Sequence, residues 1–243
     1  MSSNVSPTIP CRIVFMDAGN TLFHPSPSYE ARIGMVLNRN GFSVAPEALK
    51  KATPDVLRYA IDRIYSGRRY AVSDEADEEF WTDVYERLLE RLDFAGERRA
   101  VASEVYHNFR REDAFELFPD VPDTLESLRR AGIRMGVVSN FCTMLDDVLR
   151  FLGVHHYFSP VVISAAVGFQ KPERGIFELA LERAGVGPSE AALVGDNPVD
   201  DVEGAVSAGL TPVLIDRDGR YPGGDGVRIG SFSELGKILV LKD

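Results

Sequence analysis

The sequence predicts an α/β fold: a Rossmann-like parallel sheet with helices on both faces, plus an inserted helical-bundle cap. Short apolar runs are typical of strands buried on both faces, and helical patterns alternate with them, as crossover connections between parallel strands require. The runs are residues 13–16, 133–138, 161–163, 191–194 and 211–215. The stretch from 25 to 115 holds no strand pattern and is too long for a loop, so it predicts a separate helical unit.

The helices follow from apolar spacing and from glycines. Within the insertion, helices are expected at 29–37, 48–64 and 98–109, and another one carries the stripe Phe80, Val84, Leu88 and Leu92. Beyond the insertion, three helical runs each end before a glycine that suits a left-handed C-cap, namely Gly132, Gly153 and Gly185. The expected domains are therefore an α/β core, residues 1–24 and 116–243, and a helical cap, residues 25–115.

Composition restricts the classes of partner. The 243 residues include 27 Lys and Arg against 37 Asp and Glu, a formal net charge of −10, which argues against nucleic acid or an anionic membrane as the main partner. The two cysteines, Cys11 and Cys142, lie far apart, which excludes a disulfide framework and fits a reducing, cytoplasmic environment. No signal-peptide pattern and no membrane-spanning apolar stretch is expected. The oligomeric state stays open.

Polar side chains follow four of the predicted strands. Asp17 follows the first, Ser139 and Asn140 follow the second, Lys171 lies a short loop beyond the third, and Asp196 follows the fourth. In an open parallel sheet, ligands bind beyond the carboxyl ends of the strands. We therefore expect these side chains to gather at one edge of the sheet.

The chemistry of these groups favours a metal-assisted reaction on a phosphate. Asp17 and Asp196 offer the hard oxygen ligands that Mg²⁺ prefers. Together with Asp201 they bring three negative charges against one positive charge from Lys171, so a phosphate dianion cannot approach unaided. One Mg²⁺ brings this group to neutrality, and the lysine can hold a carboxylate and a phosphoryl oxygen at once.

Four motifs, each after a strand and with a helical insertion after the first, resemble those of the haloacid dehalogenase-like (HAD) superfamily. They are residues 17–22, 137–140, 171–172 and 194–201, and they span essentially the whole chain. The resemblance implies that Asp17 is a nucleophile that forms an aspartyl-phosphate and that Lys171 steadies it. It also implies Mg²⁺ ligands from Asp17, the Gly19 carbonyl and Asp196, with Asp201 orienting the metal shell.

Each of the remaining candidate residues has a possible functional role and a possible structural role. Thr21, Ser139 and Asn140 are candidate phosphate-binding residues, together with Lys171; the hydroxyls are otherwise turn residues, and Asn140 is otherwise a helix N-cap. Asp200 competes with Asp201 to support the metal. Asp201 is favoured because it lies five residues after Asp196, as in the family pattern.

One position departs from the family pattern. HAD phosphatases usually carry a second aspartate, a general acid and base, two residues after the nucleophile, and here that residue is Gly19. General acid–base catalysis typically contributes about 10²–10⁴-fold, so we expect slow turnover on alkyl phosphates. His24 is a candidate replacement on the path into the cap, although an exposed loop histidine is the simpler reading.

The resemblance implies a Mg²⁺-dependent phosphatase that acts on a small phosphorylated metabolite. A metal-independent 2-haloacid dehalogenase is an alternative, because that branch also lacks the second aspartate; Phe177 stands where its tyrosine is expected. A phosphonate-cleaving enzyme needs a cap lysine, for which the sequence offers only Lys50 and Lys51. A catalytically weak binding or regulatory protein with the same fold is the alternative outside enzymes.

Overall fold

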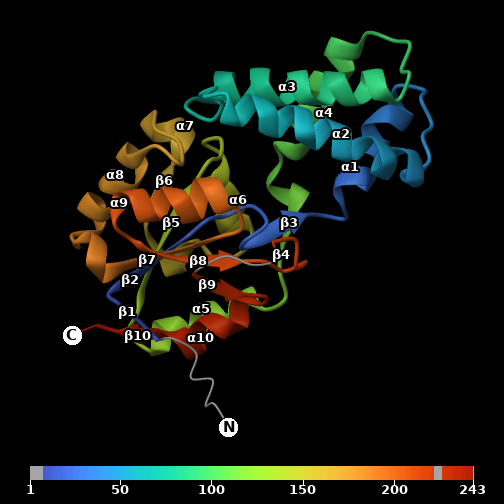
Figure 1. The fold of residues 1–243 in the computed structure, drawn as a ribbon. Coiled ribbons are helices and arrows are strands. Elements are labelled where there is room, and N and C mark those ends of the chain that lie inside the picture. The colour runs from blue at the N-terminus through green and yellow to red at the C-terminus, as the bar shows by residue number, and fades with distance from the viewer. Residues whose placement is uncertain (1–7, 222–225, 243) are drawn as a thin grey trace.

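A six-stranded parallel sheet forms the centre of the molecule. The computed structural model describes residues 8–221 and 226–242. The strand order is β6-β5-β2-β7-β8-β9, and every neighbouring pair runs parallel (Figure 1). The strands are β2 (Ile13–Met16), β5 (Arg134–Ser139), β6 (Phe158–Ile163), β7 (Ala191–Gly195), β8 (Thr211–Ile215) and β9 (Val227–Ile229). The α/β sheet that the apolar runs predict is confirmed, with β9 as a sixth strand at its edge.

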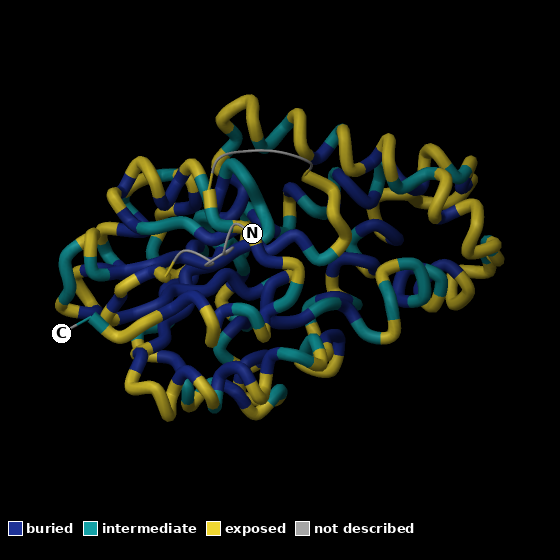
Figure 2. Tube along the Cα trace, turned by 60° about the horizontal axis from the view of Figure 1, so that its bottom comes forward, coloured by how far each residue is buried: buried dark blue, intermediate teal, exposed yellow. Residues whose placement is uncertain are grey.

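The helices cover both faces of this sheet. Along β2, Val14 and Met16 pack into the apolar cluster of one face, whereas Ile13 and Phe15 pack into the cluster of the other face. Helices α5 (Val121–Arg130), α6 (Leu145–Phe151) and α10 (Leu235–Ile238) cover the first face, and α8 (Arg174–Ala184) and α9 (Gly204–Ala208) cover the second. Figure 2 shows that buried segments run through the interior of the molecule and that exposed residues lie on its outer turns.

The helical insertion forms a bundle of its own beside the sheet. It contains α1 (Tyr29–Arg39), α2 (Pro46–Tyr65), α3 (Asp74–Arg91) and α4 (Arg98–Phe109), and these four helices lie together at one end of the molecule (Figure 1). Their inward faces share a separate apolar cluster that includes Leu37, Phe80, Leu89 and Ala102. The stripe predicted around Phe80 is therefore the inner face of a cap helix.

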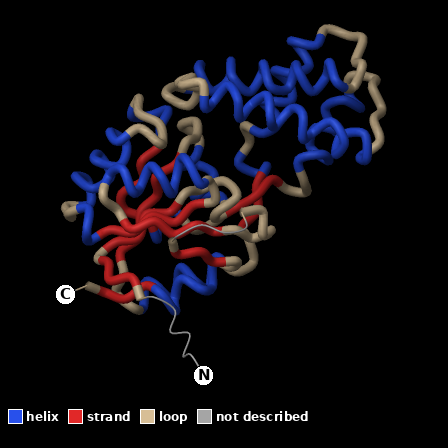
Figure 3. The backbone as a smooth tube through the Cα atoms, in the orientation of Figure 1, coloured by secondary structure: helices blue, strands red, loops and turns tan. Residues whose placement is uncertain are grey.

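Two short strands join the bundle to the sheet domain. β3 (Phe23–Pro25) pairs antiparallel with β4 (Phe115–Leu117), which follows the 3₁₀ turn Glu112–Ala114 (Figure 3). The expectation that 25–115 holds no strand is wrong at its two ends, because Pro25 and Phe115 belong to this pair. Three-residue strands have too few positions for an alternation to show in the sequence.

The remaining elements are short. β1 (Ile9–Cys11) pairs parallel with β10 (Leu239–Leu241), and α7 (Ser164–Val167) follows β6. The 3₁₀ turns are His155–Tyr157, Pro188–Glu190 and Phe232–Glu234, and a π-helical turn, η4 (Pro198–Glu203), follows β7. Gly132, Gly153 and Gly185 all have positive φ, as predicted for helix ends. Cys11 and Cys142 are buried free thiols. Within the described residues, every helix falls short of the length and apolarity that a bilayer-spanning segment needs.

Candidate active site

Asp17 lies directly after the central strand β2, where its carboxylate is fixed on one oxygen. Its backbone N–H donates to the carbonyl oxygen of Val194 on β7, at 2.8 Å. Oδ1 accepts hydrogen bonds from Ser139 Oγ at 2.9 Å and from Lys171 Nζ at 2.6 Å. In the described part of the chain the structure shows no hydrogen bond to Oδ2. One carboxylate oxygen is therefore held in place, and the other is free to react.

Lys171 connects two carboxylates across the site. Its Nζ lies 2.6 Å from Asp17 Oδ1 and 2.5 Å from Asp201 Oδ1, and its side chain is almost fully buried. The side-chain amide of Asn140 fixes the lysine backbone, because its Oδ1 accepts from Lys171 N at 2.7 Å and its Nδ2 donates to Lys171 O at 2.9 Å. The lysine is thus positioned from both its main chain and its side chain.

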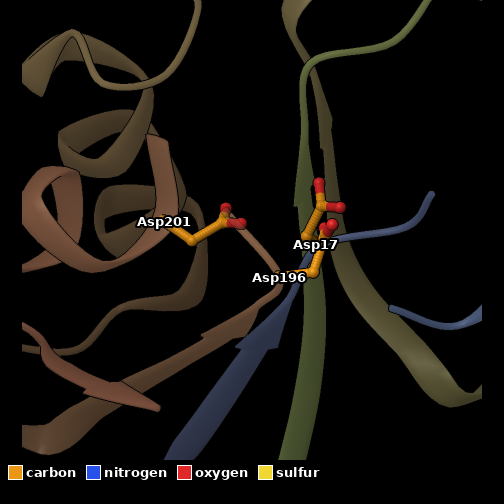
Figure 4. Close-up of side chains that lie close together, drawn as sticks. All are labelled: Asp17, Asp196 and Asp201. Atoms are coloured by element: carbon orange, nitrogen blue, oxygen red, sulfur yellow. The ribbon is translucent and has the colours of Figure 1, made fainter. Parts of the chain in front are cut away.

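Asp196 and Asp201 enter the site from the turn after β7. Asn197 caps this turn by accepting from the backbone N–H groups of Val199 and Asp200, and its own N–H donates to Asp201 Oδ2 at 3.0 Å. With this N-cap in place, the side chain of Asp201 points back toward β2. One carboxylate oxygen from each of Asp17, Asp196 and Asp201 lies within 4.8 Å of the others. Figure 4 shows the carboxylate of Asp17, which follows β2, near those of Asp196 and Asp201, which both come from the turn after β7.

Burial and neighbouring charges shift the pKa values of the acids in this cluster. Burial raises the pKa of Asp196 to about 8, and the charges of Asp17 and Asp201 act in the same direction. Burial also raises the pKa of Asp201. Burial opposes the charge on Lys171, but the two carboxylates that it contacts outweigh this effect and raise its pKa, so the ammonium stays charged. One lysine leaves the three carboxylates short of positive charge.

A cavity of about 270 Å³ lies between this cluster and the cap. The sheet domain contributes the polar floor, including Asp17, Lys171 and Asp196. The cap contributes mainly rings, and these side chains are Tyr29, Tyr70, Trp81, Tyr85 and Phe109. The cavity thus has an ionic floor and an aromatic roof, and Trp81 and Tyr85 of α3 supply part of that roof.

The structure brings most of the sequence candidates to this cavity, but not all of them. Gly19 and Asn140 line it, whereas Thr21 is fully buried, is absent from the lining, and leaves its Oγ1 without a partner. Asp200 lines the cavity but stands outside the three-carboxylate cluster. Burial raises the pKa of Asp200 to about 7.

His24 does not reach the cavity lining. Its Nδ1 lies 3.1 Å from the carbonyl oxygen of Pro25, and its ring packs 4.7 Å from the ring of Phe118. The interpretation of His24 as a replacement acid is therefore wrong, because β3 directs this residue to the strand pair beside the hinge rather than to the site.

Two charged cap residues were missed by the sequence reasoning. Asp77 looks like one of several acids that favour a helix N-terminus, yet it is buried on α3 and accepts a hydrogen bond from Arg110 Nη2. Tyr106 Oη donates to the same Asp77 oxygen at 3.0 Å. The available signal was spacing, because Asp77 continues the buried stripe of Phe80 and Val84 by one turn upstream.

Comparisons with known proteins place the chain in a family. A family model described as haloacid dehalogenase-like hydrolase matches residues 11–209. A phosphoserine phosphatase of Thermus thermophilus is 38% identical over 135 residues, 55% of this chain and 53% of that protein. A glyceraldehyde 3-phosphate phosphatase of Methanothermobacter thermautotrophicus is 40% identical over 117 residues, 46% of this chain and 50% of that protein. The alignments thus span about half of each phosphatase.

The fold comparison covers more of the chain. YfnB of Bacillus subtilis, described as a HAD-hydrolase bound to magnesium, superposes with a TM-score of 0.78 at 17% identity, over 93% of this chain and 97% of that one. This likeness shows the fold, with its parallel sheet and its inserted cap. The family match covers the whole cap and the sheet domain from β2 to α9. The chain belongs to the haloacid dehalogenase-like hydrolase family.

Proposed function

We propose that this protein is a Mg²⁺-dependent phosphatase of a small phosphorylated metabolite, acting through an aspartyl-phosphate on Asp17. The observation that carries the proposal is the state of the Asp17 carboxylate: Oδ1 is held by Ser139 and Lys171, and Oδ2 is free beside the cavity. The two aligned phosphatases support the substrate class. The division into a core, 1–24 and 116–243, and a cap, 25–115, is part of the same proposal.

The donor set fits a divalent cation. Asp17, Asp196 and Asp201 present hard carboxylate oxygens within 4.8 Å of one another, two of these residues are buried, and one lysine is the nearby cation. We propose that Asp17, Asp196 and the Gly19 carbonyl hold Mg²⁺ and that Asp201 orients its shell. When bound, the ion neutralises negative charge at the site and polarises the phosphoryl oxygens.

The protein groups account for the bond changes on phosphorus. Asp17 Oδ2 attacks the phosphorus atom, a bond forms between that oxygen and phosphorus, and the bond from phosphorus to the ester oxygen breaks. Lys171 and Ser139 hold the nucleophile through Oδ1, and the remaining N–H of Lys171 offers a donor to a phosphoryl oxygen. Ser139 donates to the phosphoryl group when its single hydroxyl hydrogen turns away from Oδ1. Asn140 acts through Lys171, whose backbone it fixes. Water then hydrolyses the phosphoaspartate, which releases phosphate and restores Asp17.

Proton transfer to the leaving oxygen is the weak step. Gly19 has no side chain that can donate a proton, and His24 lies outside the cavity. We therefore propose faster turnover for leaving groups that depart without a proton, such as an aryl oxide or an acyl group. Among the four phosphate-binding candidates, Thr21 is the least supported, because its hydroxyl is buried and it does not line the cavity.

Asp17→Asn tests the proposal. Hydrolysis of an aryl phosphate and of acetyl phosphate is expected to require Mg²⁺, and Asp17→Asn is expected to lower its rate by at least about 10³-fold because the nucleophile is lost. Asp123→Asn, an exposed aspartate on α5, serves as the matched control and is expected to keep the wild-type rate. An Asp17→Asn protein that hydrolyses these esters at the wild-type rate would refute the proposal.

Because the second aspartate is absent, 2-haloacid dehalogenation is an alternative reaction for this site. A 2-haloacid dehalogenase needs no such acid, but the acids Asp196 and Asp201 next to Asp17 would repel a haloacid carboxylate when no metal is present. Release of chloride from 2-chloropropionate without added metal would favour the dehalogenase. A stable fluoroberyllate complex on Asp17 with no turnover of any ester would favour a binding or regulatory role.

A further inference from the structure

The roof of the cavity carries one charged pair among its rings. Arg110, the C-cap residue of α4, and Asp77 of α3 both line the cavity, on the cap side and opposite the acidic cluster. The guanidinium also packs over two rings, with Cζ 4.2 Å from the centroid of Tyr106 and 5.6 Å from that of Phe141. Contacts with two rings and with Asp77 restrict the orientation of this cation.

The guanidinium retains donors that the protein does not use. Nη2 donates to Asp77, and Nε is buried without a partner. A guanidinium carries five N–H donors in a planar fork, so this single pairing leaves part of the fork free. Nε is shielded from the cavity, so a substrate oxygen pairs with an Nη donor on the exposed part of the fork. The side chain is 17% exposed, and it contributes to the cavity wall.

Asp77, by contrast, exposes almost none of its carboxylate to a substrate cation. Its side chain is 3% exposed, and one of its oxygens already accepts from both Arg110 and Tyr106. A substrate ammonium group would have to displace Arg110 from this carboxylate. The pair therefore presents donors to the cavity but hides its acceptors.

The charges around the cavity select an uncharged oxygen over a carboxylate. In the described part of the chain, five carboxylates and two cationic side chains line the cavity: Asp17, Asp77, Asp196, Asp200 and Asp201, with Lys171 and Arg110. When all five carboxylates are counted as ionised, these side chains and one divalent cation still carry a net negative charge before the phosphate enters. A second anionic group on the substrate would lie beside Asp77 and add to the repulsion.

We propose that Arg110, oriented by Asp77, donates to a hydroxyl or carbonyl oxygen on the alcohol part of the substrate. The preferred substrates are then phosphate esters of small neutral polyols or hydroxycarbonyl compounds, whose carbon chain packs against the rings of Trp81 and Tyr85. This inference rests on the proposed function for its phosphate site. It adds the class of alcohol and the residue that selects it.

Non-hydrolysable phosphonates test this proposal by binding alone. The result therefore does not depend on whether the protein hydrolyses phosphate esters. Trp81 is the only tryptophan in the chain and lines the cavity, so its fluorescence reports occupancy without turnover. The ligands are butylphosphonate, 3,4-dihydroxybutylphosphonate and 2-hydroxy-4-phosphonobutanoate, each titrated with Mg²⁺ present. We expect the dihydroxy ligand to bind about tenfold more tightly than butylphosphonate, the gain from a hydrogen bond to a charged donor. We expect the carboxylate ligand to bind no more tightly than the dihydroxy ligand.

Variants assign the preference to Arg110. Arg110→Lys keeps a cation beside Asp77 but removes the planar fork, and it is expected to reduce the tenfold preference to less than about threefold. Arg111→Lys is the matched control, since Arg111 is exposed and pairs with Asp113 away from the cavity, and it is expected to retain the preference. If Arg110→Lys does not fold, the double variant Asp77→Asn/Arg110→Gln, which neutralises both partners, provides the same comparison.

The outcomes are distinct. An unchanged preference in folded Arg110→Lys overturns the proposal, and so does tightest binding of the carboxylate ligand. Loss of the preference supports it, even in a protein that hydrolyses no ester, in which case only the proposed function fails. Hydrolysis of esters without any preference between the first two ligands leaves the proposed function standing and overturns the role of Arg110.

Discussion

At the scale of single residues, two glycines define the site by what they lack. A Cβ built on Gly19 has no heavy atom within 4 Å, so there is room for a side chain beside the nucleophile. A Cβ built on Gly195 would collide with the carboxylate of Asp201. Gly19 therefore leaves room for an acidic side chain that this protein lacks. Gly195 has to be a glycine, because the carboxylate of Asp201 occupies the space that a Cβ would need.

Gly19→Asp is expected to restore an acid to the site. The rate on an alkyl phosphate should rise about 10- to 100-fold, the lower part of the range for general acid–base catalysis, while the rate on an aryl phosphate changes little. Steady-state hydrolysis of both esters with Mg²⁺ measures this difference. Gly19→Asn, which adds a side chain of the same size without an acid, is the control. An equal gain in both variants would show that proton transfer is not the limiting step.

Gly195→Ala is expected to displace Asp201 from the acidic cluster. Because Asp201 contacts Lys171, the added methyl group disturbs both the metal ligands and the lysine, and the Mg²⁺ concentration for half-maximal activity should rise at least about tenfold. Gly34→Ala is the control, since a Cβ on Gly34 in α1 meets no neighbour within 4 Å. A Gly195→Ala enzyme with an unchanged Mg²⁺ requirement would contradict the proposed role of Asp201.

The sequence predicted the floor of the site better than its roof. Asp17, Ser139 and Asp196 could be found because each lies at or directly after the end of a strand, and strand ends are visible as the limits of apolar runs. Arg110 and Asp77 could not be paired in advance, because their contact depends on how α3 packs against α4. The spacing of apolar residues within one helix does not determine the angle at which it packs against another helix.

At the scale of elements, length decides what can be predicted. The strands from β2 to β8 in the parallel sheet are four to six residues of mostly buried side chains, so they stand out as apolar runs. β9 has three residues, one of them exposed, and β3 contains a histidine and a proline. Such strands form because the tertiary structure supplies a partner, not because their own sequence favours them.

Asp120 fixes the start of α5 to the C-terminal part of the chain. Its Oδ2 accepts from Arg217 Nη1 at 2.8 Å, Ser231 Oγ at 2.7 Å and Phe232 N at 2.8 Å. Burial alone would raise the pKa of Asp120, but the hydrogen bonds, that from Arg217 first, outweigh it and lower the pKa. The ionised carboxylate is therefore the form that holds α5 in place.

Asp120→Ala is expected to lower the free energy of unfolding at pH 7 by about 2–3 kcal/mol, because hydrogen bonds to a charged group are lost and their donors stay behind. A depressed pKa contributes stability above the ordinary aspartate value, and this contribution disappears as the pH falls through the folded-state pKa. The difference between wild type and variant should thus shrink below about pH 4. Urea unfolding at pH 7 and at low pH measures it. A difference that persists in acid would assign the effect to packing.

At the scale of the whole molecule, polar contacts link the cap to the segment that carries Lys171. Arg69 pairs with Glu173 at 2.8 Å and donates to the carbonyl oxygen of Gly168 at 2.6 Å. Gln170 Oε1 accepts from Ala71 N at 3.0 Å. These contacts join the connection between α2 and α3 to the segment before α8, and we expect them to stabilise the present arrangement of cap and sheet domain.

Arg69→Ala is expected to favour the open arrangement. An exposed ion pair contributes up to about 1 kcal/mol, so KM should rise by no more than about fivefold, while kcat stays the same or increases if product release is slow. Steady-state kinetics on the best ester measures both constants. Arg174→Ala is the control, because Arg174 pairs with Glu178 on its own helix. Equal changes in the two variants would show that the cap contacts do not affect substrate binding.

The position of β2 has a consequence for how the chain is made. This strand lies between β5 and β7, and the whole cap separates it in sequence from both neighbours. On the ribosome, the four helices of residues 29–109 emerge as one contiguous unit with its own apolar cluster, while the strand that precedes Asp17 still has no partner on either side. The helices of the cap are thus synthesised before most of the sheet domain. The acids Asp17, Asp196 and Asp201 meet only after β7 and the turn that follows it have been synthesised.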